Sequence, residues 1–253
     1  MKKITLAIIQ ARLTSKRFPG KILKKIGNEI ILDKIYYNIL KSKKIDNTVV
    51  SIPNNKKNLR LKKYLIKKRI NFFCGSENDV LSRFFKTAKE FKASTIVRIT
   101  ADCPLVDHKL IDKMLTIFNK SKLDIISNTI YPSFPNGLDV EIFNFNSLNL
   151  SNDFAKKKYD REHVTSYMYK NKNFLKKSYT NKFDYSSIHF TVDEKKDLKL
   201  INEVIKKTDK KNFNWIDLLE TLKKNKELMK KIQHSKNKDV QKLDTGPKLW
   251  KEA

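Results

Sequence analysis

Short runs of apolar residues alternate with longer amphipathic stretches through the first half of the chain. The apolar runs predict strands at residues 4–10, 48–52, 71–74, 95–99 and 123–127. The stretches between them predict helices at residues 30–41, 59–68, 77–91 and 107–119, with Ser76 and Asp107 as candidate caps of the last two. This alternation is typical of an α/β fold. We therefore expect a mostly parallel central sheet with helices on both faces.

The pattern becomes less regular after residue 127. Residues 128–137 are rich in Pro, Asn and Gly, which predicts a loop. Beyond it we expect strands at 140–143, 174–180 and 188–192, and helices at 159–170, 195–207, 213–223 and 226–233. Residues 236–253 are polar and contain a Gly-Pro pair. The pattern therefore predicts one domain over residues 1–235, followed by a polar tail or linker.

Composition excludes several classes of protein. Hydrophobic residues make up 40% of the 253 residues and aromatic residues 10%, which is enough for a sizeable core and excludes a disordered chain. The longest apolar runs hold about six residues, well below the roughly 20 that a membrane span needs, so we expect no membrane insertion. The apolar run at the N-terminus is also too short for a signal peptide, which favours the cytoplasm. The two cysteines have neither disulfide-framework nor metal-site spacing.

Charge first suggests nucleic acid, because 55 Lys and Arg face 27 Asp and Glu and the net charge is +28. Only seven of the 55 basic residues are Arg, however, and the Lys are spread along the whole chain. Nucleic-acid surfaces cluster their charge and use Arg where planar hydrogen bonding matters. We interpret most Lys as a solvated surface and expect no specific nucleic-acid partner. Because Arg is rare in this chain, the positions where it does occur are candidates for functional sites.

A basic loop follows the first predicted strand directly. It begins at Gln10 and Ala11 and carries Arg12, Arg17 and Lys21. Open α/β sheets bind ligands at the carboxyl ends of their strands, and three cations on one loop suit a triphosphate or a pyrophosphate leaving group. The loop matches neither the Walker A pattern nor G-x-G-x-x-G. An ordinary basic surface loop is the alternative.

Two aspartates at the ends of predicted strands are candidate metal ligands. Asp102 follows the strand at 95–99, and Asp193 follows the one at 188–192. Mg²⁺ binds through one or two carboxylates while phosphates and water complete its octahedron. A turn or helix cap is the alternative, and it describes Asp107 better than Asp102. Together, the two carboxylates and the basic loop favour metal-assisted nucleotidyl transfer.

Two polar motifs in the second half indicate a polar, hydroxylated, anionic substrate. The first contains Asp139 and Glu141, and the second contains Arg161, Glu162 and His163. Mixed donors and acceptors suit such a ligand. The alternatives are a structural histidine and a simple helix-capping cluster.

Several motifs occur together in an order that matches a known family. They are IIQARLTSKRFPGKIL, GSENDVLSRFF, VRITADCPLVD, SNT, PNGLDVEIF, YDREHVT and FTVDEKKDL, and they span about residues 3–230. The chain resembles the cytidylyltransferases of the spore-coat polysaccharide type, which are relatives of the enzymes that make CMP-sialic acid and CMP-Kdo. The resemblance implies a Rossmann-like domain of the nucleotide-diphospho-sugar transferase type, usually a homodimer. It also implies transfer of CMP from CTP to a sugar acid or other anionic acceptor, with Mg²⁺ and release of pyrophosphate.

The resemblance also assigns residues to roles. Arg12 and Lys21 match triphosphate positions, and Asp102 and Asp193 match the Mg²⁺ positions. The nucleotide site would consist of Gln10, Ala11, Arg12, Lys21, Ser76, Asp79, Arg83 and Thr100, with Thr100 near the base. The acceptor site would consist of Asn128, Asp139, Glu141, Arg161, Glu162 and His163. Arg12, Lys21, Asp102 and His163 are the catalytic candidates. The sequence does not name the general base, for which His163 and a metal-bound hydroxide are candidates. Residues 13–16 are Leu-Thr-Ser-Lys, whereas the corresponding positions in many members of this family are richer in Gly.

Two other functions remain as alternatives. A glycosyltransferase of similar fold typically carries a D-x-D metal motif, whereas this chain has Ala101-Asp102-Cys103. A nucleic-acid binder should show clustered Arg and aromatic platforms, and the sequence shows neither. Residues 245–253 resemble the first helix of glutamate-semialdehyde-mutase-like aminotransferases. The chain could therefore lead into a fused aminotransferase domain.

Overall fold

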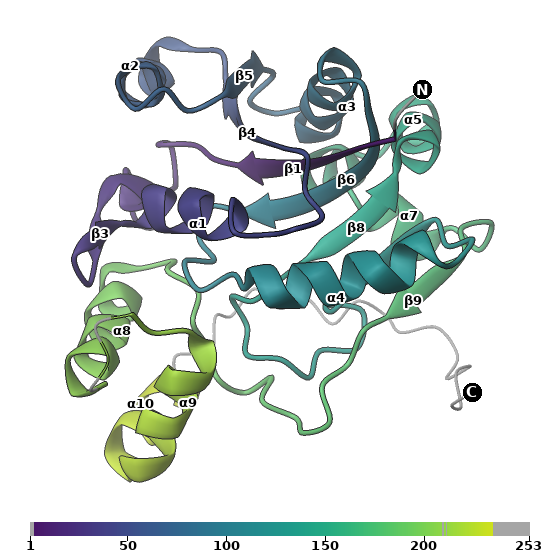
Figure 1. Cartoon of the computed structure of the whole chain (residues 1–253). Helices are drawn as coiled ribbons and strands as arrows, with labels where there is room; N and C mark the ends of the chain where they lie inside the picture. Colours follow the sequence, from purple (N-terminus) through teal and green to yellow (C-terminus); the bar gives the residue numbers. More distant parts are fainter. Residues whose placement is uncertain (1–2, 209, 211, 235–253) are drawn as a thin grey trace.

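A single twisted sheet forms the centre of the computed structural model, which describes residues 3–208, 210 and 212–234 (Figure 1). Its seven strands lie in the order β5-β4-β1-β6-β8-β7-β9. They are β1 (Ile4–Gln10), β4 (Asn47–Pro53), β5 (Phe72–Gly75), β6 (Ala93–Thr100), β7 (Ile125–Ser127), β8 (Glu141–Asn144) and β9 (Lys176–Ser178). All neighbours are parallel except that β8 runs antiparallel to β6 and to β7. The predicted mostly parallel sheet is confirmed.

Helices cover both faces of the sheet, as predicted. They are α1 (Ile31–Ile39), α2 (Leu59–Lys67), α3 (Val80–Glu90), α4 (His108–Asn119), α5 (Phe145–Phe154), α6 (Lys158–His163), α7 (Ser166–Lys170), α8 (Lys195–Lys207), α9 (Trp215–Lys224) and α10 (Lys226–His234). Alternate residues of β1 belong to opposite layers of core. Ala7 and Ile9 pack with α1, α2 and α4, whereas Leu6 and Ile8 pack with α3, α5 and α7. This two-sided burial explains why the strand is continuously apolar.

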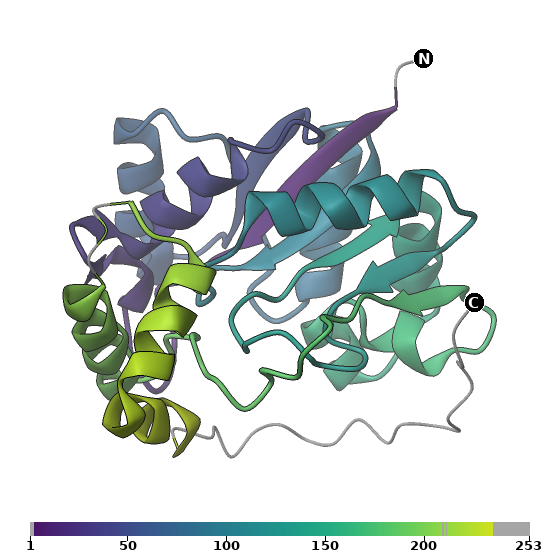
Figure 2. The same cartoon turned by 60° about the horizontal axis from the view of Figure 1, so that its bottom comes forward.

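Helices α8, α9 and α10 gather at one end of the sheet (Figure 2). The chain that leads to α8 runs past the carboxyl ends of the central strands, and Asp193 lies on it. The polar tail predicted at 236–253, and with it the resemblance at 245–253, lies outside the described residues. Among the described helices, none combines the length and the apolar character that crossing a bilayer requires.

Some predicted elements were wrong. The helix expected at 159–170 is broken into α6 and α7 at Val164, whose φ of 56° is incompatible with a continuous helix. The strand expected at 188–192 is an extended segment that makes one isolated bridge, between His189 and Asn136. Helix α3 begins at Val80 with Asp79 as its cap, rather than after Ser76. Helix α5 and the short hairpin of β2 (Lys25–Ile26) and β3 (Glu29–Ile30) were not predicted.

The central strands bring the first loop and the loop after β6 to the same edge. Gln10 at the end of β1 pairs with Thr100 at the end of β6. The ladder continues one residue further, since the Ala101 amide donates to the Gln10 carbonyl at 3.0 Å. Residues that follow these two strands therefore lie side by side.

Candidate active site

Side chains from elsewhere in the chain hold the first loop in place. The Leu13 amide donates to Asn58 Oδ1 at 2.8 Å, and Thr14 Oγ1 donates to Glu77 Oε1 at 2.6 Å. The loop closes where the Gly20 amide donates to the Leu13 carbonyl at 2.9 Å, and Gly20 has a φ of 70°. Asn58 and Glu77 thus stabilise the loop from outside it.

Lys21 lies between the two predicted metal carboxylates. Its Nζ is 3.3 Å from Asp102 Oδ2 and 3.0 Å from Asp193 Oδ1, and only 8% of its side chain is exposed. Burial lowers the pKa of Lys21, but the two carboxylates raise it by more, so the amine stays charged. Arg17 adds a second cation 3.3 Å from Asp193 Oδ1. The structure therefore brings the basic loop and both aspartates together.

Backbone contacts fix the two aspartates beside each other. The Val192 amide donates to the Asp102 carbonyl at 2.9 Å, which ties the segment before α8 to the loop after β6. Glu194, not Asp193, is the cap residue of α8. Burial raises the pKa of Asp102, but the charge of Lys21 and hydrogen bonds from Thr100 and Lys21 together lower it by more, so this carboxyl is ionised. Asp107 instead caps α4, as the alternative predicted.

The donor set fits a hard divalent cation. Two carboxylates converge on one buried amine, and Mg²⁺ is commonly held by one or two carboxylates plus substrate phosphates. No group of three or more metal-ligating side chains occurs within the described residues. Phosphate and water oxygens would have to complete the coordination, which is how Mg²⁺ binds at nucleotide sites.

A glycine contact joins the second half of the site to the segment that carries Asp193. Gly137 has a φ of 104°, and a Cβ placed on it would lie 2.7 Å from both the Phe190 carbonyl carbon and the Thr191 nitrogen. The Asn136 amide donates to the Ile188 carbonyl at 2.9 Å, and its carbonyl accepts from the Phe190 amide at 2.7 Å. Only glycine permits this close approach.

A polar pocket opens beside the carboxylates. Arg98, Thr100, Thr129, Asp139 and Glu141 line it, and its volume is about 170 Å³. We call it the Asp139 pocket. Arg98 on β6 pairs with Glu141, the first residue of β8, and the two lie opposite each other in the strand register. The antiparallel strand therefore delivers a carboxylate to the edge where the parallel strands end.

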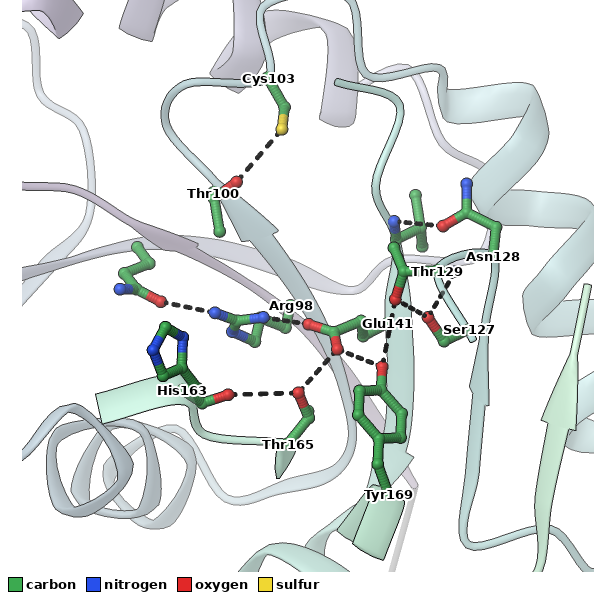
Figure 3. A network of polar contacts seen from close by, with 12 residues as sticks. Arg98, Thr100, Cys103, Ser127, Asn128, Thr129, Glu141, His163, Thr165 and Tyr169 are labelled. Atoms are coloured by element: carbon green, nitrogen blue, oxygen red, sulfur yellow. Dashed lines mark hydrogen bonds and ion pairs between the residues drawn. The ribbon is translucent and has the colours of Figure 1, made fainter. Parts of the chain in front are cut away.

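Glu141 is the centre of a hydrogen-bond network (Figure 3). Thr165 Oγ1 donates to Glu141 Oε1 at 2.7 Å, and the Tyr169 hydroxyl donates to the same oxygen. Arg98 also donates to Gln10 Oε1 at 3.1 Å. Burial lowers the pKa of Arg98, but the charge of Glu141 and the hydrogen bond to it together raise that pKa by more, so the guanidinium stays charged.

Comparison with known proteins decides the family. The cytidylyltransferase family model matches residues 6–240. The chain belongs to the cytidylyltransferase family. An uncharacterized protein of Methanocaldococcus jannaschii is 37% identical over 228 residues, which are 88% of this chain and 92% of that relative. The spore coat polysaccharide biosynthesis protein SpsF of Bacillus subtilis is 30% identical over 87% of this chain and 94% of its own length.

The fold agrees with a solved member of the family. A cytidylyltransferase from Leptospira borgpetersenii superposes with a TM-score of 0.85 at 30% identity, covering 93% of this chain and 99% of that one. The chain is thus a CTP-dependent nucleotidyltransferase with the Rossmann-like fold of this family.

Some residues predicted to bind substrate make structural contacts in the cytidylyltransferase. Asp79 caps α3 and pairs with Arg161 through two hydrogen bonds, from Nε at 3.0 Å and from NH2 at 2.6 Å. Arg161 also donates to the Asn152 carbonyl at 2.6 Å. Asn128 clamps its own loop, since its amide donates to the Leu138 carbonyl and its Oδ1 accepts from the Val140 amide. Asp79, Arg161 and Asn128 therefore position the walls of the site.

Arg83 is a buried cation with spare hydrogen-bonding capacity. It is 1% exposed, its NH1 donates to the Ser76 carbonyl, and its Nε has no partner among the described residues. Burial and the positive charge of Arg12 lower the pKa of Arg83 to about 10. Two neighbouring guanidinium groups whose positive charges repel each other favour the binding of an anion between them. Gly75 allows this packing, because a Cβ there would lie 2.7 Å from Arg83 Cγ.

His163 and Glu162 are exposed at the end of α6. The His163 ring packs on Tyr159, with 4.2 Å between ring centroids. Partial desolvation lowers the pKa of His163, and the charges of Arg98 and Lys170 add to this lowering, which outweighs the opposing charge of Glu162. The imidazole is therefore neutral near pH 7 and able to accept a proton.

Sequence reasoning missed several residues of the site. Arg98, Thr165 and Tyr169 build the Glu141 network, and Asn58 and Glu77 hold the first loop. Arg98 could have been found, because it is one of seven Arg and stands inside an otherwise apolar strand. Glu77 and Thr165 lie inside the motifs GSENDVLSRFF and YDREHVT, which gave them no individual role, whereas Asn58 and Tyr169 lie outside every motif.

Proposed function

We propose that the cytidylyltransferase transfers CMP from CTP to a sugar acid or another anionic acceptor, with Mg²⁺ and release of pyrophosphate, in the biosynthesis of surface polysaccharides or glycoconjugates. The observation that carries the proposal is the placement of Lys21 between Asp102 and Asp193, next to the basic loop. A cation loop beside two converging carboxylates suits the triphosphate and metal of a nucleotidyl transfer.

The chemistry is an in-line displacement at the α-phosphorus. An acceptor oxygen forms a bond to that phosphorus, the bond to the oxygen bridging the α- and β-phosphates breaks, and its electron pair leaves with pyrophosphate. Arg12 and Lys21 stabilise the charge that builds on this leaving group. Asp102 and Asp193 would hold Mg²⁺, which when bound neutralises and orients phosphate oxygens.

The remaining residues bind the substrates or position the residues that do. Gln10, Ala11, Ser76, Arg83 and Thr100 form the nucleotide side, and Asp139, Glu162 and His163 form the acceptor side. Asp79, Asn128, Glu141 and Arg161 hold the walls of the site in place. His163 accepts the proton where the attacking acceptor oxygen carries one, and its lowered pKa supports this role.

The proposal also includes the setting of the enzyme. Free Cys74 and Cys103 fit the reducing cytoplasm. A homodimer is the assembly that the family resemblance implies, and light scattering measures it. Dispersed Lys should give only weak nucleic-acid binding that disappears at physiological salt, which a filter-binding titration at two salt concentrations would check.

A pyrophosphate-release assay with Mg²⁺ and a panel of sugar acids and phosphorylated acceptors tests the proposal. We expect CTP to be used in preference to ATP, GTP and UTP. Asp102→Asn and Asp193→Asn should each lower turnover roughly 100-fold or more, since charge stabilisation of this kind is worth several kcal/mol. Asp153→Asn, at an exposed carboxylate far from the loop in sequence, is the matched control. Equal rates with all four nucleotides would remove the cytidylyl assignment.

A further inference from the structure

The Asp139 pocket has one basic lining residue, Arg98, and its charge is already paired with Glu141. Arg98 donates to Glu141 and to Gln10. Its remaining Nε is enclosed and has no partner among the described residues, so it is not presented to a ligand. The pocket therefore offers no accessible compensating cation to an incoming carboxylate or phosphate.

Glu141 is also fully engaged. Its Oε2 accepts from Arg98, and its Oε1 accepts from Thr165 and Tyr169. The side chain is buried and its charge is balanced by the guanidinium. We assign Glu141 a structural role, which is to hold Arg98 and the pocket wall in place.

Asp139 differs from Glu141 in lacking this compensation. Within the described residues, its carboxylate receives a single hydrogen bond, at 3.4 Å from the Gly137 amide. Burial and the nearby negative charges of Asp102 and Glu141 raise the pKa of Asp139 to about 7, although the Gly137 amide and the charge of Arg98 act in the opposite direction. Desolvating a half-buried carboxylate that has so few partners costs free energy. A ligand that neutralised this carboxylate would offset that free energy.

We propose that Asp139 binds a protonated amino group of the acceptor, so that the acceptor is a zwitterion whose anionic end attacks the nucleotide. An ammonium group supplies both the missing hydrogen-bond donors and the missing positive charge. A hydroxyl group supplies a donor without the charge, and a second anionic group in the pocket would face Asp139 and Glu141. This inference rests on the proposed function and narrows its acceptor to amino-bearing compounds.

The test compares three phosphates that differ at one atom or group. The dissociation constants of 2-aminoethyl phosphate, 2-hydroxyethyl phosphate and ethyl phosphate are measured by calorimetry at pH 8, with CMP and Mg²⁺ present to prevent turnover. We expect the amino compound to bind about tenfold or more tightly than the other two, the size of one charge-assisted hydrogen bond. Asp139→Asn should remove this preference, and Asp153→Asn should retain it.

Equal binding of the three phosphates to the wild-type protein would overturn the inference, as would no binding of any of them. A preference that survives Asp139→Asn would do the same. The wild-type comparison remains decisive if the variant does not fold. A separate titration with CTP keeps the two ideas apart: failure to bind CTP contradicts the proposed function, whereas normal CTP binding without amine preference contradicts only this inference.

Discussion

Gly137→Ala should damage the protein at the contact that joins the two halves of the site. The added Cβ would lie 2.7 Å from the Phe190 carbonyl carbon and from the Thr191 nitrogen, both of which are backbone atoms that cannot rotate away. Ordinary contact begins near 3.4 Å, so the segments must separate by about 0.7 Å. That displacement reaches Asp193, two residues beyond Thr191.

Two costs add in this variant. An alanine at a φ of 104° carries strain of about 1–3 kcal/mol, and displacing packed backbone costs about 1–3 kcal/mol more. Gly27→Ala is the matched control. Gly27 also has a positive φ, of 58°, but its nearest neighbour would be a side-chain methyl at an ordinary 3.7 Å. We expect Gly27→Ala to cost about 1–2 kcal/mol, which is the left-handed strain alone.

Urea denaturation followed by circular dichroism measures both variants. The two variants should differ even more in turnover than in stability, because displacing a catalytic group by nearly 1 Å can lower the rate about 100-fold. Gly137→Ala should therefore lose activity well beyond its loss of folded protein, and Gly27→Ala should not. Equal unfolding free energies for the two variants would refute the argument from close approach.

Three further predictions follow from charges in the site. Arg12→Ala should lower turnover and CTP affinity while leaving CMP affinity nearly unchanged, because CMP lacks the β- and γ-phosphates. Parallel calorimetric titrations with CTP and CMP would check this. An equal loss of CMP affinity would show that Arg12 does not bind the triphosphate. Lys21→Met removes the charge that lowers the pKa of Asp102, so the acidic limit of nucleotide-free Mn²⁺ binding, measured by electron paramagnetic resonance, should move to higher pH. For Asp139, the folded pKa of about 7 lies above the unfolded value, so the folded protein holds a proton that the unfolded chain loses between about pH 4 and 7. Wild-type stability should consequently fall across that window, and urea midpoints of Asp139→Asn should show a smaller fall.

Much of the fold could be predicted because buried parallel strands carry a strong local pattern. Residues 4–10 and 95–99 are apolar runs between amphipathic helices, and they form β1 and most of β6. The break between α6 and α7 could not be predicted, because it occurs at Val164, a β-branched residue that rarely adopts a positive φ. The run at 188–192 has the composition of a strand, yet its partner is the loop containing Asn136 and not another strand.

The closeness of candidate site residues could be predicted where they directly follow the end of a strand. Asp102 and the basic loop directly follow β6 and β1, so topology alone brings them together. The pairing of Arg161 with Asp79 spans 82 residues and leaves no periodic trace in the sequence. From the motif alone, Arg161 resembles a substrate ligand. In the folded protein its guanidinium fork is occupied by Asp79 and Asn152, a fact that only three-dimensional packing reveals.

The reversed direction of β8 has a consequence for how the enzyme can diversify. Parallel strands contribute to the candidate site from their carboxyl ends, through the loops that follow them. Strand β8 contributes Glu141 from its beginning, so the segment at 128–140 that precedes it enters the site from the opposite direction. Insertions or exchanges within that segment would reshape the pocket around Asp139 while leaving the loops after β1 and β6 intact. The segment before β8 and the loops after β1 and β6 thus reach the pocket from opposite directions, and Gly137 couples that segment to the one that carries Asp193.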